Sequence, residues 1–243
     1  MSHTLFISDL HLSDARPALA RTLLRFLGRE APAASHLWIL GDLFDFWVGD
    51  DARDEGVNAE VTQALRALVE TGTPVSVMCG NRDFLLGEGF AAAAGARLVA
   101  DPWVGDLHGT RTLLLHGDTL CTDDVDYQAF RRHVRQPAVQ AAFLAQPVEA
   151  RRRQVGQTRA LTDQAKRAKT EAIMDVTPAA VTEALRNSGA VRMIHGHTHR
   201  PARHTHPVDG RACERWVLSD WDTGPECLRV DVDGCRRVPL TPG

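Results

Sequence analysis

Seven side chains of metal-binding type stand directly after short apolar runs of the sequence, in five clusters. Two clusters hold a pair of such residues spaced by two, and each of the others holds one residue beside a glycine. Imidazoles, carboxylates and one amide suit Mn, Fe, Zn or Ni, and the absence of cysteine from the clusters argues against a soft-metal centre. The candidate ligands are Asp9, His11, Asp42, Asn81, His116, His195 and His197.

This number of ligands is too large for one ion and suits two, provided that one carboxylate bridges them. Two ions about 3.5–4 Å apart clamp the attacking and leaving oxygens of a phosphoryl displacement, and they lower the pKa of a shared water. Two divalent ions carry more positive charge than Asp9 and Asp42 offset, so the site stays attractive to a phosphorylated substrate. The residues therefore predict hydrolysis of a phosphate ester or anhydride.

The apolar runs must position these residues, and their length and β-branched content favour strands. The runs cover residues 4–7, 37–40, 75–79, 112–115 and 191–194. Helical patterns lie between the early runs, at residues 17–27 and 58–69, so we expect parallel strands that are covered by helices. Ligand sites in such sheets form beyond the carboxyl ends of the strands, where all the clusters lie.

The segment of residues 123–186 differs in composition, being rich in Ala, Arg, Gln and Leu and broken by prolines. We interpret it as several helices that form a cap beside the sheet. Ten basic and three acidic residues lie between positions 126 and 170, which suggests a face for an anion, although a solvated helix face is the simpler interpretation. The end of the chain is expected to contain strands, at residues 216–218, 227–232 and 237–240.

Length and composition limit the classes of protein. The 243 residues suffice for one α/β domain with an inserted segment, and the net charge of −3 offers no support for nucleic-acid binding. Five cysteines without a C-x-x-C pair, and a start without an apolar leader, favour a reducing compartment and argue against secretion. No run of about 18 apolar residues predicts a membrane-spanning helix, and peripheral association stays open.

Five short motifs together resemble the calcineurin-like metallophosphoesterases. They are D-L-H from Asp9, G-D-L-F-D from Gly41, G-N-R-D from Gly80, H-G-D from His116 and G-H-T-H from Gly196. Each motif is weak alone, but all of them in the family's order are highly specific. The resemblance implies a four-layer αββα sandwich with a helical cap insertion. It also implies one metal on Asp9, His11, Asp42 and His197 and another on Asp42, Asn81, His116 and His195, with Asp42 as the bridge.

Arg82 departs from the pattern of many members of this family, in which a histidine follows the motif asparagine and acts on the leaving group. An arginine keeps its proton near neutral pH, so it is a poor general acid but a good clamp for phosphate. An alkoxide leaving group usually needs a proton, whereas a phosphate monoester, with a second pKa of about 6, does not. Arg82 thus favours cleavage of a pyrophosphate.

Longer segments resemble the UDP-2,3-diacylglucosamine hydrolase family of lipid A biosynthesis over nearly the whole chain. They are G-N-R-D-F-L-L-G, H-G-D-T-L-C-T-D-D, A-I-M-D-V and H-G-H-T-H-R-P. This resemblance implies two Mn(II) ions and attack of water on the α-phosphorus of the substrate, which gives UMP and 2,3-diacylglucosamine 1-phosphate (lipid X). It also implies a peripheral enzyme on the cytoplasmic face of the inner membrane.

The same resemblance assigns roles residue by residue. Thr162 stands where a serine is expected and keeps the hydroxyl, and Lys166 stands where an asparagine can occur, which leaves its role open. The basic cap would meet the diphosphate or lipid headgroups, and its apolar face would hold acyl chains. The implied catalytic residues are Asp42, Asn81, Arg82 and His116, and the implied substrate contacts are Asn81, Arg82, Asp124, Thr162, Lys166, Lys169 and His195.

Several other polar residues keep structural interpretations. His199 is expected to be structural or to support a ligand, and Asp45, Asp83 and Asp118 are expected to orient ligands. Asp50 and Asp51 are expected in a solvated loop. The run of Arg151, Arg152 and Arg153 is equally well interpreted as a solvated face or as a membrane contact.

Two alternatives to a lipid pyrophosphatase remain. A general metallophosphoesterase would act on soluble nucleotides or phosphodiesters, but the basic, partly apolar cap and Arg82 argue against it. A protein that has kept the fold and lost catalysis would be marked by missing ligands, and all the expected ligand types are present.

Overall fold

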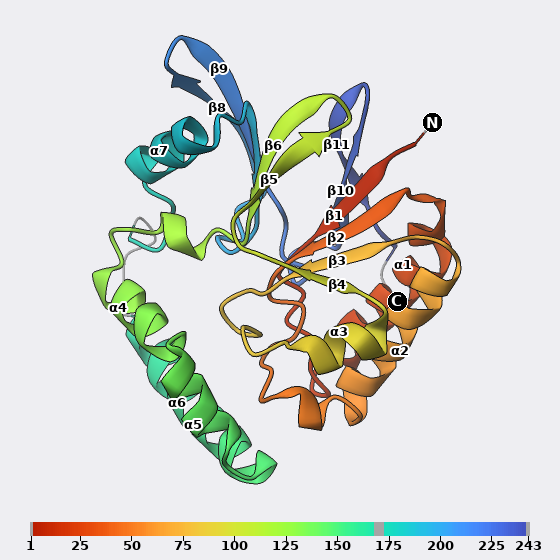
Figure 1. The fold of residues 1–243 in the computed structure, drawn as a ribbon, viewed down its shortest axis with the longest axis vertical. Helices are drawn as coiled ribbons and strands as arrows, with labels where there is room; N and C mark the ends of the chain where they lie inside the picture. The colour runs from red at the N-terminus through yellow and green to blue at the C-terminus, as the bar shows by residue number, and fades with distance from the viewer. Residues whose placement is uncertain (1, 168–172, 242–243) are drawn as a thin grey trace.

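Two β-sheets packed face to face form the centre of the molecule, and helices cover their outer faces (Figure 1). The computed structural model describes residues 2–167 and 173–241, and within its longest helix it describes side chains up to residue 159. The layers follow the order helix, sheet, sheet, helix, which confirms the expected αββα sandwich.

The first sheet has the strand order β11-β10-β1-β2-β3-β4. Its four strands from β1 to β4 are parallel, and β10 and β11 extend the sheet with antiparallel pairing. The strands are β1 (Thr4–Ile7), β2 (His36–Leu40), β3 (Val75–Met78), β4 (Arg97–Val99), β10 (Glu226–Asp231) and β11 (Gly234–Pro239). Its outer face is covered by α1 (Pro17–Arg29), α2 (Gly56–Glu70) and α3 (Glu88–Ala94), with the short helix η1 (Ala31–Ala33) after α1.

The second sheet has the strand order β5-β6-β7-β9-β8. Strands β6, β7 and β9 are parallel, and the edge strands β5 and β8 are antiparallel to their neighbours. Helix α7 (Pro178–Ser188) covers its outer face, where Val181 and Leu185 pack with Met193. The strands are β5 (Trp103–Leu107), β6 (Thr110–Leu115), β7 (Arg192–His195), β8 (Ala202–Val208) and β9 (Arg211–Val217).

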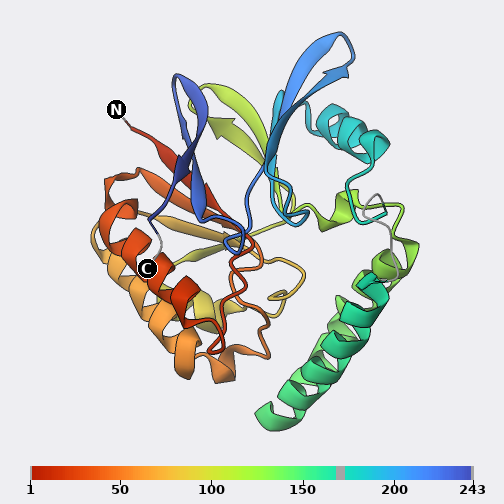
Figure 2. The ribbon, with the colours of Figure 1, turned by 180° about the vertical axis from the view of Figure 1, so that it is seen from behind.

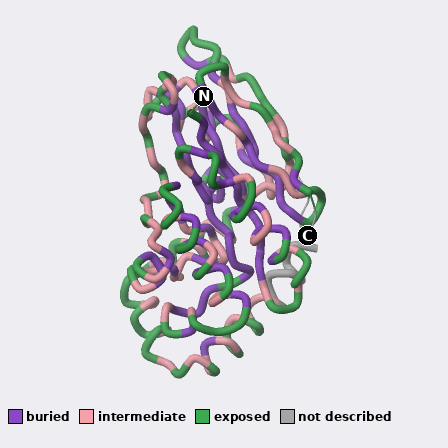
Figure 3. Tube along the Cα trace, turned by 90° about the vertical axis from the view of Figure 1, so that its right-hand side faces the viewer, coloured by how far each residue is buried: buried purple, intermediate pink, exposed green. Residues whose placement is uncertain are grey.

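The core between the two sheets is built from large apolar side chains. Phe6, Trp38 and Met78 of the first sheet pack with Leu114 and Ile194 of the second. The central strands are thus buried on both faces, which is why they read as continuous apolar runs in the sequence. Figure 3 shows this pattern as buried residues that follow the strands.

Three helices leave the sandwich as one elongated group (Figures 1 and 2). They are α4 (Val125–Val134), α5 (Pro137–Leu144) and α6 (Val148–Arg167), and a short helix, η3 (Asp118–Leu120), precedes them. We call α4, α5 and α6 the cap. Helix α7 also lies within the predicted insertion of residues 123–186, but it packs on the second sheet instead of joining the cap.

Arginines of α6 connect the cap to the loop that follows β2. Arg151 is only 1% exposed and donates to the carbonyl oxygen of Val48 and to both carboxylate oxygens of Asp51. Arg152 pairs with Glu55. The expectation of a solvated or membrane-facing run is therefore wrong for Arg151, because its guanidinium group is used inside the molecule.

Asp50 is not a solvated loop residue either. It lies in the short helix η2 (Asp50–Ala52), and its carboxylate accepts hydrogen bonds from the backbone of Gly87 and Phe90, at 3.1 Å each, and from Trp47 Nε1 at 3.0 Å. These bonds tie the loop after β2 to the start of α3.

Candidate metal centre

The loops after β1, β2, β3, β6 and β7 converge at one end of the sandwich, as the sequence predicted from the carboxyl ends of the strands. Asp42 lies at the centre of this convergence, with its Oδ2 atom 3.8 Å from His11 Nδ1 and 3.8 Å from His116 Nε2. Asn81 lies beside it, with its Oδ1 atom 3.0 Å from His116 Nε2 and 2.8 Å from His197 Nδ1. Side chains from both sheets therefore meet at a single place.

The backbone of these loops is unusual where the polar side chains begin. Five non-glycine residues there have positive φ angles, a region that L-residues rarely adopt. Such conformations persist only where the surrounding structure enforces them, and they cluster at functional sites. The residues are Asp9 (57°), His11 (49°), Asp42 (53°), His197 (69°) and His199 (54°).

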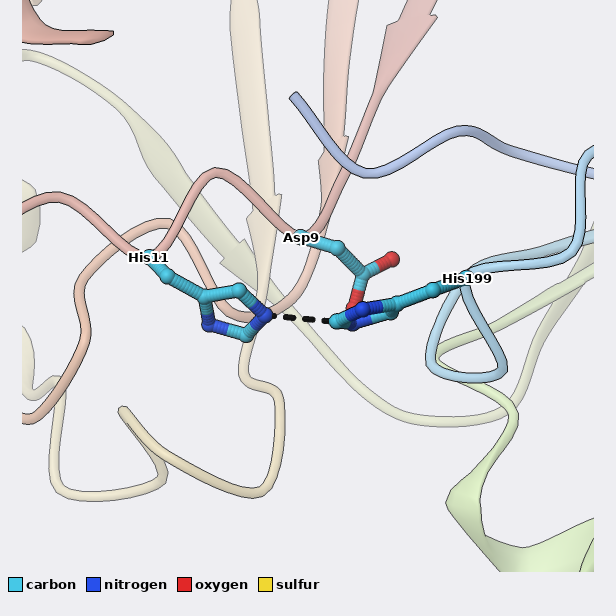
Figure 4. Close-up of side chains that lie close together, drawn as sticks. All are labelled: Asp9, His11 and His199. Carbon is cyan, nitrogen blue, oxygen red and sulfur yellow. Dashed lines mark hydrogen bonds and ion pairs between the residues drawn. The ribbon is translucent and has the colours of Figure 1, made fainter. Parts of the chain in front are cut away.

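Two overlapping groups of side chains have the geometry of cation sites. Asp9, His11 and His199 form one group, and Asp9, Asp42 and His116 form the other, with the ligand atoms of each group within 4.8 Å of one another. His199 Nε2 lies 3.4 Å from Asp9 Oδ1 and 3.1 Å from His11 Nε2, and Figure 4 shows how the three side chains point together.

The structure changes the expected role of His195. Both of its ring nitrogens face other groups: Nδ1 lies 2.8 Å from the carbonyl oxygen of Gly196, and Nε2 lies 3.0 Å from Arg215 Nη1. The cause is the alternation of side chains along β7, which turns His195 to the same face as Met193, the face under α7. Burial and Arg215 lower the pKa of His195 to about 3, so the ring is neutral.

The other two histidines of the H-G-H-T-H segment reach the site instead. His197 stands beside Asn81 and stacks against Tyr127 at a ring distance of 5.9 Å, and His199 joins Asp9 and His11. His197 thus lies where His195 was expected, and His199 lies where His197 was expected. The segment contains two overlapping pairs of histidines spaced by two, His195 with His197 and His197 with His199. The residue types do not distinguish the pairs, whereas the direction of the side chains along β7 does.

The centre has buried polar atoms that are suited to a cation. Asp9 Oδ1 and His11 Nδ1 are buried, and the polar groups that face them, His199 Nε2 at 3.4 Å and Asp42 Oδ2 at 3.8 Å, do not form a hydrogen bond of ordinary geometry with them. Buried polar atoms nearly always have a partner, so these two fit ligation of a metal. Burial lowers the pKa of His11 to about 2 in spite of Asp9, so its imidazole is neutral and has a lone pair to offer.

The carboxylates of the centre attract positive charge. Burial alone would raise the pKa of Asp9, but the neighbouring His199 and His116 outweigh burial and hold that pKa below its usual range. Against the effect of burial, Asp42 and Asp9 raise the pKa of His116 to about 9, and Asp220 and Asp9 raise that of His199 to about 10. Divalent cations can displace protons from such histidines, since metal binding releases protons from its ligands.

The aspartates that were expected to orient ligands hold the loops in place. The carboxylate of Asp83 is buried and accepts hydrogen bonds from the backbone of Gly80, Asp42 and Leu43. Asp118 accepts from Tyr127 Oη at 2.7 Å and from Arg131 Nε at 2.6 Å, which connects the loop after β6 to α4.

A cavity of about 670 Å³ leads from this centre to the cap. Asn81, Arg82 and Tyr127 belong to its lining, and side chains of the cap line much of the rest; these are both apolar, such as Phe130 and Phe143, and basic, such as Arg131. The backbone N–H of Arg82 donates to Asp42 Oδ1 at 2.8 Å, and its Nη1 lies 3.1 Å from Asp45 Oδ1. The guanidinium group of Arg82 thus lines the cavity beside Asp45. Tyr127 was missed by the sequence analysis because no motif marks it.

The remaining predicted substrate contacts lie on or near the cap. Asp124 is the N-cap residue of α4, where its carboxylate accepts a hydrogen bond from the backbone of Tyr127 at 3.1 Å. Thr162 and Lys166 belong to α6, in the part whose side chains are not described, and Lys169 lies outside the described residues.

Comparisons with known proteins give similarity over most of the chain. The profile of the calcineurin-like phosphoesterase family matches residues 2–201. The UDP-2,3-diacylglucosamine hydrolase of Xanthomonas axonopodis pv. citri is 50% identical over 244 residues, which span 98% of this chain and 98% of the relative. The protein of the same name from Aromatoleum aromaticum is 51% identical over 230 residues, spanning 95% of this chain and 94% of the relative.

Solved structures are more distant. An archaeal phosphodiesterase aligns with 98% of this chain and 99% of its own, at a TM-score of 0.49 and 12% sequence identity. This likeness is too distant to bear on the reaction.

Proposed function

Since this chain belongs to the calcineurin-like phosphoesterase family, and within it to the UDP-2,3-diacylglucosamine hydrolases, we propose that it hydrolyses the pyrophosphate bond of UDP-2,3-diacylglucosamine. The products are UMP and 2,3-diacylglucosamine 1-phosphate (lipid X), formed when water attacks the α-phosphorus. The observation that carries this proposal is the cavity of about 670 Å³, which joins the candidate metal centre to an apolar space in the cap. A substrate with a diphosphate next to two acyl chains matches this arrangement, in which a polar centre adjoins an apolar space.

The proposed cofactors are two Mn(II) ions. Asp9, His11, Asp42 and His199 would hold one, and Asp42, Asn81, His116 and His197 would hold the other, so Asp42 remains the proposed bridge. When bound, such a pair of ions lowers the pKa of water to near neutrality and offsets the negative charge of the phosphoryl group in the transition state.

Two side chains beside the centre have proposed roles in binding the diphosphate. Arg82 can donate two parallel hydrogen bonds to phosphate oxygens, and its backbone N–H is already used to fix Asp42. Tyr127 lines the same end of the cavity, and its hydroxyl is oriented by Asp118. Neither residue needs to deliver a proton, because the leaving group is a phosphate monoester.

A peripheral position at the cytoplasmic face of the inner membrane is part of the proposal. Among the described helices, none is long and apolar enough to cross a bilayer. Support for surface contact comes from the cap, where the large apolar side chains of Phe130 and Leu144 are 41% and 40% exposed. A lipid substrate would be drawn from such a surface into the cavity.

The test is product analysis in oxygen-18 water with UDP-2,3-diacylglucosamine and Mn(II). Label in UMP, and none in the phosphate of lipid X, would support attack at the α-phosphorus. Label in the lipid phosphate would contradict that position of attack.

The second candidate function is a phosphoesterase for soluble nucleotides or phosphodiesters, which the same metal centre would serve. The same assay run with a dinucleotide polyphosphate and a simple diester distinguishes it. Hydrolysis of these at the rate of the lipid substrate would favour the second candidate, because the apolar part of the cavity would then contribute nothing.

A further inference from the structure

His195 sits between two groups that can each act in only one way. Arg215 Nη1 lies 3.0 Å from Nε2, and a guanidinium group can only donate a hydrogen bond. The carbonyl oxygen of Gly196 lies 2.8 Å from Nδ1, and a carbonyl can only accept one. A neutral imidazole satisfies both groups in one tautomer alone, with the proton on Nδ1 and the lone pair on Nε2.

Arg215 is itself enclosed. It lies on β9 and is 6% exposed, and its Nε donates to His206 Nε2 at 3.2 Å. None of the ion pairs among the described residues includes Arg215. Burial lowers the pKa of Arg215, and the carboxylate of Asp175 offsets this only in part, without forming an ion pair. A buried cation whose hydrogen-bond partners are histidines instead of carboxylates costs free energy, so its position calls for a reason beyond packing.

The Gly196 carbonyl starts the turn that presents both site histidines. It accepts hydrogen bonds from His195 Nδ1 and from the backbone N–H of Thr198, each at 2.8 Å. The turn continues into His197 and His199, whose positive φ angles of 69° and 54° must be enforced by their surroundings. Gly117 packs so closely here that a Cβ atom would lie 2.7 Å from His195 Nδ1.

We propose that Arg215 is a positioning residue for the metal centre, which acts by keeping His195 in the Nδ1–H tautomer. In that tautomer the ring donates to the Gly196 carbonyl and holds the turn that carries His197 and His199. The opposite tautomer would set an N–H against the guanidinium group and a lone pair against the carbonyl oxygen, so both contacts would become repulsive. The inference rests on the proposed function only in taking the centre as a site that binds metal ions.

The test begins with the metal-free wild-type protein, labelled with nitrogen-15 in histidine. The ring nitrogen shifts of His195 should show protonated Nδ1 and unprotonated Nε2. Arg215→Met, which keeps length and apolar volume but has no donor, should give a mixture of tautomers. Its affinity for Mn(II), titrated in the absence of substrate, should fall about tenfold or more, as expected for loss of a group that orients a ligand.

Two further variants separate this role from general packing. His206→Ala removes the other hydrogen-bond partner that the structure describes for Arg215. It should leave the His195 tautomer unchanged and the Mn(II) affinity within about twofold of wild type. Arg215→Lys keeps a donor and should restore the Nδ1–H tautomer.

Protonated Nε2 in the wild-type protein would overturn the proposal, whatever the variants do. An unchanged tautomer and metal affinity in Arg215→Met would overturn it as well. Because every readout is made without substrate, failure of the proposed lipid hydrolysis would be seen separately.

Discussion

Asp42 is the proposed bridge between the two halves of the candidate metal centre. Its carboxylate is buried within 3.8 Å of both His11 and His116, and its Oδ1 accepts from the Arg82 backbone. Asp42→Asn preserves shape and most hydrogen bonds but removes the charge that two cations would share. We expect metal content to fall from two ions to one or none, and turnover to fall at least about a hundredfold. Elemental analysis and the hydrolysis assay would show this.

The matched control for Asp42→Asn is Asp106→Asn, an exposed hairpin residue that accepts a hydrogen bond from Gly109. It should keep both metal content and activity. Two bound ions in Asp42→Asn would contradict the assignment of Asp42 as the bridge.

His199, for which the sequence predicted only a structural or supporting role, is a proposed ligand of the centre. His199→Ala should lose the cation that Asp9 and His11 share, because it removes one side chain of that group. We expect about one metal ion fewer per chain by elemental analysis, while His204→Ala, a change on strand β8, should retain both. Full metal content in His199→Ala would return His199 to a structural role.

Arg82 is expected to contribute to substrate binding and not to metal binding. Arg82→Ala leaves the backbone bond to Asp42 in place but removes a charged donor from the cavity. Loss of a charge-assisted hydrogen bond corresponds to a fall in kcat/KM of about ten- to a hundredfold, with metal content unchanged. Arg82→Lys should recover only part of this, since lysine lacks the planar fork. Metal loss in Arg82→Ala would show that Arg82 supports the centre itself.

At the scale of elements, α6 determines how the cap sits on the body. Arg151 is the buried link, and it joins α6 to Val48 and Asp51. Arg151→Met should loosen the cap, because the Val48 carbonyl loses its donor. Hydrogen exchange of α6 should rise about tenfold while that of the sandwich strands stays unchanged.

Arg153 offers the matched control, because it follows in the same helix and is exposed. Arg153→Met should leave the exchange of α6 at the wild-type rate. Equal exchange rates of α6 in the two variants would mean that packing among the helices of the cap, and not Arg151, protects α6 from exchange.

At the scale of the whole molecule, the candidate metal centre joins the two sheets. Asp9, Asp42 and Asn81 follow strands of the first sheet, whereas His116 and His197 follow strands of the second. Metal removal by a chelator should therefore lower the Tm of the entire sandwich. A ligand at a hundred times its Kd stabilises by about 2.7 kcal/mol, which corresponds to roughly 5–10 °C for a chain of this size. Calorimetry with and without chelator would measure the shift, and Asp42→Asn should show little of it.

An unchanged Tm on complete metal removal would contradict a centre that bridges the sheets. A shift confined to a separate low-temperature transition would instead place the metals' effect in one part of the molecule.

The elements of the sandwich could be predicted because local sequence carries their signal. Buried parallel strands appear in the sequence as apolar runs, and α1 and α2 appear as apolar residues at helical spacing. Residues such as Asp9, Asp42 and His116 could therefore be placed at strand ends. The position of α7 on the second sheet could not be predicted, because its composition resembles that of the cap and only packing with Met193 separates the two.

By itself, the sequence determined the family and the αββα architecture, because these depend on residue types and on the order of motifs along the chain. It also predicted a centre of nitrogen and oxygen ligands. Only the tertiary structure decided which histidines lie at the candidate metal centre. Side-chain alternation along β7 turns His195 toward Arg215, and the turn after it brings His197 and His199 to Asn81 and Asp9. Likewise, only folding buries Arg151, whose contact with Asp51 joins residues a hundred positions apart. Only folding places Arg82 in one cavity with the cap, whose residues lie several tens of positions further along the chain. No local sequence pattern records contacts over such separations.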